Sequence, residues 1–179
     1  VSADHFIVDK ETGQVLRVGL LQGNVAQDAK WDPANQAPIL RRYIDLSRQA
    51  IGAGAGVVIW PEASMPFFFD ADSAAAEPVR RLAAESRTPI IVGADESEPG
   101  LNGETGRIYN SAILVGPDGR SRGSYRKMQL VPFGEYVPLR SLFFFAESIT
   151  KDVSAFTPGR SLQPVALGGH AIGVGICFE

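Results

Sequence analysis

The run Val57-Val58-Ile59-Trp60-Pro61-Glu62 is the stretch from which the fold can be worked out. Four successive apolar residues predict a short buried strand, and Pro61 ends it because proline cannot donate to a ladder of hydrogen bonds. Apolar residues recur at helical spacing from Ile39 to Ile51, before this strand, and residues 74–86 predict a second helix after it. Strands and helices therefore alternate in this part of the chain.

The same alternation extends in both directions. Residues 17–22 and 89–94 are short apolar runs that predict the neighbouring buried strands. Trp31-Asp32-Pro33 predicts the start of the first helix. Residues 95–107 are rich in turn-forming and charged residues and predict a surface loop. Residues 1–15 have little periodicity, and we expect a lead-in or linker there.

The second half of the chain predicts hairpins in place of helical connections. Residues 111–115 and 120–126 flank the turn sequence Gly116-Pro117-Asp118-Gly119. Residues 165–167 and 171–176 flank Gly168-Gly169, and the second of these runs leads as a buried strand to Cys177. We therefore expect an α/β fold whose sheet is mixed, with parallel and antiparallel pairs.

Composition excludes several classes of function. The chain has 179 residues, of which 45% are hydrophobic and 21% charged, enough for one sizeable core. The net charge of −3 is spread along the chain, so no basic patch predicts binding to nucleic acid. His5 and His170 are isolated and the chain has a single cysteine, so we expect no metal site and no cofactor. No apolar stretch is long enough to span a bilayer, and no signal peptide opens the sequence.

Three residues follow predicted strands and form a chemically coherent set, namely Glu62, Lys127 and Cys177. Taken singly, each also fits a structural role, as a solvated loop carboxylate, a surface lysine and a buried thiol. Together they supply a nucleophile, a base that takes the proton of the thiol, and an ammonium group that stabilises the thiolate and an oxyanion.

These segments resemble the Glu-Lys-Cys triad of the nitrilase (carbon–nitrogen hydrolase) superfamily, in the order of that superfamily. The matching segments are Val18 to Gln22, Pro61-Glu62, Tyr125-Arg126-Lys127 and Gly175-Ile176-Cys177. The resemblance implies a four-layer α-β-β-α sandwich. It also implies that Glu62 is the general base, Lys127 the oxyanion stabiliser, and Cys177 the nucleophile that forms a thioester.

Within that superfamily the sequence is most similar to the apolipoprotein N-acyltransferase branch. The similarity lies in Gln22-Gly23-Asn24 with Lys30-Trp31-Asp32, in Trp60-Pro61-Glu62, in the long motif from Gln129 to Pro138, and in Ile176-Cys177-Phe178-Glu179. It implies that Glu135 and Glu179 support the active site.

The same similarity implies a ping-pong reaction and a location. An acyl chain passes from a phospholipid to Cys177, and then to the α-amine of a lipid-modified N-terminal cysteine of an apolipoprotein. Enzymes of this branch are bacterial inner-membrane proteins whose catalytic domain lies on the periplasmic side. We therefore expect residues 16–179 to be the N-terminal part of a nitrilase-like catalytic domain, C-terminally truncated, with the rest of the domain and the membrane spans outside this chain.

Two phenylalanine clusters fit a lipid substrate, because consecutive phenylalanines in loops expose apolar surface. They are Phe67-Phe68-Phe69 after Glu62 and Phe143-Phe144-Phe145 after the long motif. We expect at least one of them to be a mobile lid that faces acyl chains or a membrane surface, although short core segments would have the same composition. Two other functions stay open, a soluble amidase that hydrolyses a carbon–nitrogen bond and a catalytically silent interaction domain.

Overall fold

The computed structural model describes residues 3–8, 15–26, 30, 32–69, 73–100, 106–132, 135, 156–162, 164–167 and 170–179. In chain order the elements are β1 (Ala3–Val8), β2 (Val15–Leu20), the short 3-10 helix η1 (Pro33–Asn35), α2 (Gln36–Gly52), β3 (Val57–Ile59), α3 (Ser73–Ser86), β4 (Ile90–Glu98), β5 (Arg107–Val115), β6 (Ser121–Arg126), β7 (Val165–Leu167) and β8 (His170–Ile172).

Strands β1 to β6 form one six-stranded sheet in sequence order. β2, β3 and β4 are parallel to one another, whereas β1 pairs antiparallel with β2, and β5 pairs antiparallel with both β4 and β6. β7 and β8 form a separate two-stranded sheet. The prediction of a mixed sheet is confirmed, because helices connect the parallel strands and turns connect the later antiparallel ones.

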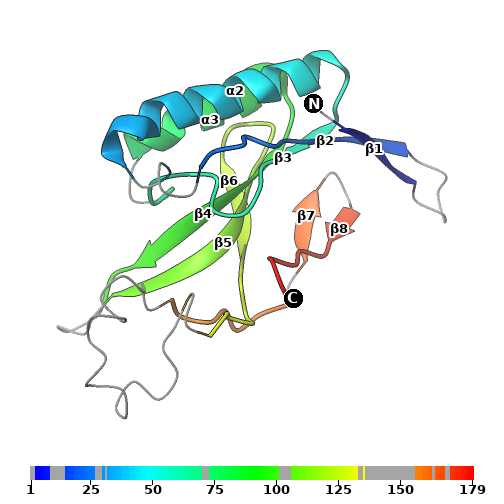
Figure 1. Cartoon of the computed structure of the whole chain (residues 1–179). Helices are drawn as coiled ribbons and strands as arrows, with labels where there is room; N and C mark the ends of the chain where they lie inside the picture. Colours follow the sequence, from blue (N-terminus) through cyan, green and yellow to red (C-terminus); the bar gives the residue numbers. More distant parts are fainter. Residues whose placement is uncertain are drawn as a thin grey trace, which may run out of the picture.

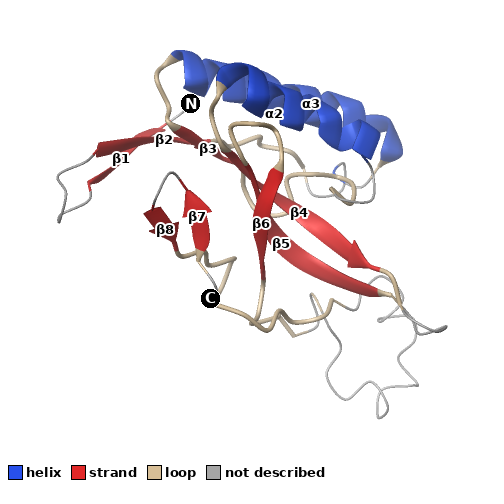
Figure 2. Cartoon of the chain, turned by 180° about the vertical axis from the view of Figure 1, so that it is seen from behind, coloured by secondary structure: helices blue, strands red, loops and turns tan. Residues whose placement is uncertain are grey.

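The two faces of the sheet are covered differently (Figure 1). Helices α2 and α3 lie side by side on one face, where Ile44 and Ala83 pack against Val58 and Val92. The β7–β8 hairpin lies on the other face, and Figure 2 shows the same arrangement from behind. Because neighbouring residues of a strand point to opposite faces, Val57 packs on the hairpin side while Val58 packs on the helical side.

Helix α2 fixes the strand that leads to Glu62. Asp32 begins the helical segment, because its carboxylate accepts a hydrogen bond of 2.9 Å from the Ala34 N–H. On the buried face, the Tyr43 ring stacks on Trp60 with a centroid distance of 4.8 Å. Trp60 Nε1 donates to Ser47 Oγ at 2.9 Å, and these contacts hold the end of β3 in place.

Three segments differ from the predictions. β4 continues to Glu98 and pairs with β5 back to Arg107, so the prediction of a loop from residue 95 is wrong for residues 95–98. Residues 3–8 of the expected lead-in form β1, whose backbone pairs with β2. Strand β8 ends at Ile172, so residues 173–176 lead to Cys177 outside any strand, and alternating glycine explains why this run does not continue the ladder. Within the described ranges, no helix is both long enough and apolar enough to cross a membrane.

Candidate active site

Glu62 lies on a tight loop that runs beside the first half of β4. The Trp60 N–H donates to the Ile91 carbonyl at 2.8 Å, and the Met65 N–H and the Ser64 hydroxyl both donate to the Gly93 carbonyl at 3.1 and 2.9 Å. A β-carbon on Gly93 would lie 2.8 Å from the Glu62 Cα, so only glycine lets the loop approach this closely. The Glu62 side chain is 36% exposed.

Lys127 follows β6 directly, and its ammonium group is buried between two carboxylates. Its backbone N–H donates to the Asn110 carbonyl at 2.8 Å, and its side chain is 1% exposed. Nζ lies 3.3 Å from Glu62 Oε1 and 2.9 Å from Glu135 Oε2. Burial alone would lower the pKa of Lys127, but the hydrogen bond from Lys127 to Glu135 and the charges of both carboxylates raise it. The site therefore keeps this lysine positively charged.

Glu135 is the second carboxylate on Lys127, and it is held on both oxygens. Oε2 accepts a hydrogen bond of 2.8 Å from the Val131 N–H, and Oε1 accepts one of 2.8 Å from the side-chain amide of Asn110. Burial acts to raise the pKa of Glu135, but these donors and Lys127 bring that pKa below its ordinary value. Glu135 is therefore an anion that balances the charge of Lys127.

Cys177 is exposed and lies in the turn that follows β8. Its φ of +59° is in the left-handed region, which residues other than glycine seldom adopt and which is frequent at functional sites. Cys177 and Glu62 line the same cavity of about 330 Å³, whose other walls are mainly apolar, from Ile59, Trp60 and Ile176. Among the described residues, neither Glu62 nor Lys127 forms a hydrogen bond with the thiol.

Glu179 joins the Cys177 turn to the segment that carries Lys127. Its Oε1 accepts hydrogen bonds of 2.7 and 2.9 Å from the N–H groups of Met128 and Gln129, and its Oε2 accepts bonds of 2.8 and 2.9 Å from the Tyr125 hydroxyl and the Ile176 N–H. Burial opposes ionisation, but these donors lower the pKa of Glu179, while burial and the Glu179 carboxylate raise the pKa of Tyr125 to about 12.

The structure thus brings four of the predicted residues into one region. Glu135 and Glu62 hold Lys127, and Glu62 shares its cavity with Cys177. Glu179 binds the backbone near the site: its carboxylate accepts hydrogen bonds from the N–H groups of Gln129, two residues after Lys127, and of Ile176, the residue before Cys177. Within the described part of the chain, no group of three or more His, Cys, Asp or Glu side chains is arranged to hold a metal ion.

The first phenylalanine cluster only partly fits the expectation of a lipid-facing loop. Phe69 is fully buried in the core under the helices, so the expectation that its side chain faces lipid is wrong, because the chain folds this ring inward against α3. Phe67 is half-buried and packs against the same core. Phe68 is half-buried, and its backbone forms a bridge with Asp95 of β4. Phe143, Phe144 and Phe145 lie outside the described residues.

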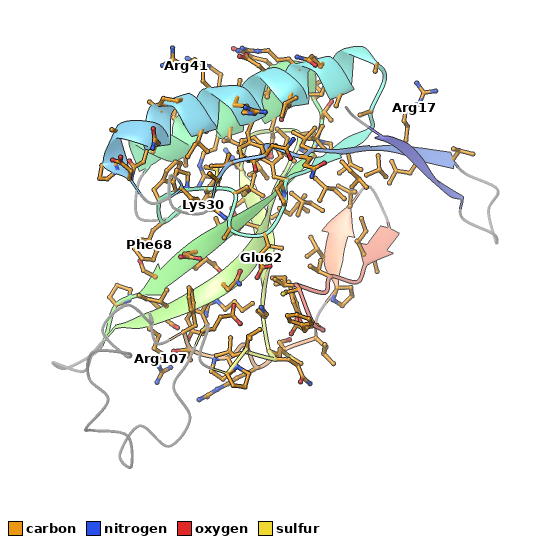
Figure 3. All side chains as sticks on the ribbon, viewed as in Figure 1. Arg17, Lys30, Arg41, Glu62, Phe68 and Arg107 are labelled. Atoms are coloured by element: carbon orange, nitrogen blue, oxygen red, sulfur yellow. The ribbon has the colours of Figure 1, made fainter. Side chains whose placement is uncertain are left out.

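Asn110 and Asp95 lie beside the site and were not singled out in the sequence, and Lys30 was noted only as part of a motif. Asn110 donates to both Glu62 and Glu135, and the signal that could have found it is an amide just before the apolar run from Ala112 to Val115 of β5. Lys30 lines a second cavity of about 230 Å³ on the other side of Glu62, and burial lowers the pKa of this lysine. Burial also raises the pKa of Asp95 to about 6, with Lys30 acting against it. Figure 3 shows Lys30 nearer the helical layer than Glu62.

Comparison with known proteins places these features in a family. The carbon–nitrogen hydrolase family model matches residues 17–179. An apolipoprotein N-acyltransferase of Geobacter metallireducens is 38% identical over 170 residues, which are 94% of this chain and 32% of the relative. One of Shewanella oneidensis is 33% identical, with 94% of this chain and 33% of the relative covered. The chain thus spans about a third of the length of these curated relatives.

Solved structures show the same fold at lower identity. A carbon–nitrogen hydrolase from Helicobacter pylori G27 superposes with a TM-score of 0.62 at 20% identity, and the match covers 91% of this chain and 51% of that one. An amidase from Nesterenkonia sp. AN1, solved after Michael addition of acrylamide at its active site cysteine, gives 0.58 at 22% identity and covers 91% and 57%. The expected nitrilase-like α/β fold is confirmed. The match of the family model over nearly the whole chain shows that the chain belongs to the carbon–nitrogen hydrolase family.

Proposed function

We propose that the complete protein is an N-acyltransferase that moves a fatty acyl chain from a phospholipid, through a thioester on Cys177, to the α-amine of a lipid-modified N-terminal cysteine of an apolipoprotein. The observation that carries the proposal is that Glu62 and Cys177 line one mainly apolar cavity while Glu62 is in contact with Lys127. The curated relatives named apolipoprotein N-acyltransferase support the choice of substrates.

In the first half of the reaction, Glu62 takes the proton of the Cys177 thiol, and the thiolate attacks the ester carbonyl carbon of the phospholipid. A C–S bond forms, the C–O bond breaks, and the proton passes from Glu62 to the departing lysophospholipid oxygen. In the second half, the α-amine attacks the thioester, a C–N bond forms and the C–S bond breaks. The amine loses a proton to Glu62, and Glu62 gives that proton to the departing Cys177 thiolate, which restores the thiol and the carboxylate.

Lys127 stabilises the oxyanion of each tetrahedral intermediate. A lysine ammonium group has three N–H donors. Nζ lies 3.3 Å from Glu62 Oε1 and 3.0 and 2.9 Å from the two oxygens of Glu135. One donor to each carboxylate holds the group, and the third turns from the second Glu135 oxygen to the substrate oxygen. Because the ammonium group is buried and its pKa is raised, it stays charged throughout the cycle and acts in a medium where electrostatic stabilisation is strong.

The apolar surroundings of Cys177 fit an acyl chain as substrate. Ile59, Trp60 and Ile176 line the shared cavity, and Phe178, the next residue after the thiol, is 83% exposed. The same proposal includes a location at the bacterial inner membrane, with this domain on the periplasmic side, because the phospholipid and the lipid-modified apolipoprotein are both held in a membrane.

The test follows the acyl group. The complete protein is incubated with a phospholipid that carries a labelled acyl chain, and the label is sought on Cys177 as a hydroxylamine-sensitive thioester. A peptide with a diacylglyceryl N-terminal cysteine is then added. We expect label on Cys177, none in Cys177→Ala, transfer to the peptide amine, and a loss of thioester formation of about 10²- to 10⁴-fold in Glu62→Gln.

The other outcomes identify the alternatives. Release of the label as free fatty acid, with no transfer to the amine, would indicate a hydrolase such as an amidase. A thiol that takes up neither label nor acrylamide would indicate an interaction domain. Thioester formation at the wild-type rate in Glu62→Gln would overturn the mechanism.

A further inference from the structure

Asn110 lies at the centre of the site, although no motif pointed to it. It is a residue of β5 and is 5% exposed. Its side-chain nitrogen Nδ2 lies 2.7 Å from Glu62 Oε1 and 2.8 Å from Glu135 Oε1, so one amide group donates to both carboxylates.

The same two carboxylate oxygens also accept hydrogen bonds from Lys127. Nζ lies 3.3 Å from Glu62 Oε1 and 3.0 Å from Glu135 Oε1. The four groups therefore form a closed ring in which donors and carboxylates alternate. In this ring the Asn110 amide adds a second bridge between two like charges that would otherwise repel each other.

The orientation of the amide is determined by its neighbours. If nitrogen and oxygen were exchanged, the amide oxygen would face two carboxylate oxygens at hydrogen-bond distance, which is repulsive. In the observed orientation, the Asn110 oxygen is buried and no described residue donates to it. A buried acceptor without a partner destabilises a protein, so this position retains the amide for its two N–H donors.

The backbone of Asn110 takes part as well. Its carbonyl oxygen accepts the hydrogen bond of the Lys127 N–H at 2.8 Å. In the β4–β5 register Asn110 lies opposite Asp95, deep within a nine-residue antiparallel ladder. The amide is therefore mounted on a rigid part of the sheet, which suits a group that must hold others in place.

These bonds leave the two oxygens of Glu62 in different states. Oε1 is taken by Asn110 and Lys127, whereas no described residue donates a hydrogen bond to Oε2. We propose that Asn110 is a positioning residue that holds Glu62 Oε1, so that Oε2 is presented to the Cys177 thiol. This inference rests on the proposed role of Glu62 as general base.

The experiment compares Asn110→Ala and Asn110→Asp in the complete protein, with Tyr109→Phe as the matched control. Tyr109 is the preceding residue of β5, and its hydroxyl donates to Glu98 at 2.7 Å, away from the site. The rate of thioester formation is measured against phospholipid concentration, and thermal unfolding is recorded for each variant. We expect kcat to fall about 10- to 100-fold in Asn110→Ala with an unchanged KM, and to stay at the wild-type value in Tyr109→Phe.

Asn110→Asp separates positioning from packing. Aspartate has the shape of asparagine but lacks the N–H donors and adds a third carboxylate, so its kcat should fall at least as far as that of Asn110→Ala. A purely structural role would give the opposite order, with the isosteric variant more active. If Asn110→Asp fails to fold, Asn110→Ala is combined with Glu62→Gln, and the pair should lose little beyond Glu62→Gln alone.

The results distinguish a failure of the positioning role of Asn110 from a failure of the proposed function. If Asn110→Ala keeps the wild-type kcat while Glu62→Gln is slow, the positioning role alone is overturned. The same holds if the loss of kcat in the double variant equals the product of the two single losses. Wild-type kcat in Glu62→Gln overturns the proposed function, and this inference with it.

Discussion

Replacing Glu179 by glutamine tests whether the Cys177 turn must be tied to the Lys127 segment. The carboxylate accepts four hydrogen bonds, two on each oxygen. A glutamine has one acceptor oxygen, which can serve the N–H groups of Met128 and Gln129. Its amide nitrogen can donate to the Tyr125 oxygen, but it faces the Ile176 N–H, which loses its partner.

The magnitude follows from that single lost bond. A hydrogen bond to a charged group contributes about 1.5–3 kcal/mol, and the low end applies because the site is partly open to water. About 1.5 kcal/mol corresponds to a roughly tenfold smaller population of the aligned turn, and hence to a roughly tenfold slower formation of the thioester. Glu179→Ala loses all four bonds and should be slower still.

The assay combines kinetics with pH. Thioester formation on Cys177 is timed for wild type, Glu179→Gln and Glu179→Ala in the complete protein, and thermal unfolding is measured from pH 7 to pH 3. Because the pKa of Glu179 is lowered below 4.5 in the folded protein, its stabilising contribution is present above that pH and is lost as the pH falls through the folded value. The stability difference between wild type and Glu179→Gln should therefore shrink toward pH 3.

One result would refute this reasoning. If Glu179→Ala forms the thioester at the wild-type rate and unfolds at the wild-type temperature, the four hydrogen bonds do not hold the turn. A loss of stability without any loss of rate would restrict Glu179 to a structural role.

Further substitutions test three other parts of the structure. Gly93→Ala places a β-carbon 2.8 Å from the Glu62 Cα and should abolish most of the activity. Gly52→Ala is the control, because an added β-carbon there has no atom within 4 Å, and it should be neutral or slightly stabilising. Activity and thermal unfolding are measured for both variants. Burial raises the pKa of Asp95 to about 6, so its charged form destabilises the fold. Asp95→Asn should therefore raise the free energy of unfolding above pH 6 by up to about 3 kcal/mol and change nothing near pH 4. Unfolding as a function of pH tests this, and an equal effect at both pH values would contradict it. Phe69→Ala should lower the free energy of unfolding by about 3–5 kcal/mol, because the ring is fully buried. Phe68→Ala should lower it much less, because Phe68 is half-buried. Equal losses in chemical denaturation would contradict these burial assignments.

Periodicity predicted the elements whose burial is regular. The apolar stripe from Ile39 to Ile51 and the run from Val57 to Trp60 became α2 and β3 because each buries one continuous set of side chains against the same core. The polar end of β4 was missed, since Asp95 and Glu96 are buried although they are not apolar: their backbones pair with β5, and Glu96 also has side-chain partners. Glu96, for example, accepts hydrogen bonds from Ser124 and Arg126 of β6.

The candidate site could be predicted only in part, for a similar reason. Glu62, Lys127 and Cys177 each follow a predicted strand, and that position drew attention to them. Asn110 lies inside a strand, and its importance depends on a cross-strand register that the sequence does not display. The prediction that Phe69 faces lipid was wrong, because composition does not tell on which side of a loop a ring packs.

The alternation of side chains along β5 has a consequence for evolution and engineering. Asn110 faces the carboxylates, whereas its neighbours on the strand point to the opposite face of the sheet. A single-residue insertion or deletion that shifts the register of β5 against β4 at Asn110 would turn the amide away from Glu62 and bring Tyr109 or Ser111 into its place. Insertions or deletions that shift the register of β5 should therefore abolish activity even where the protein still folds.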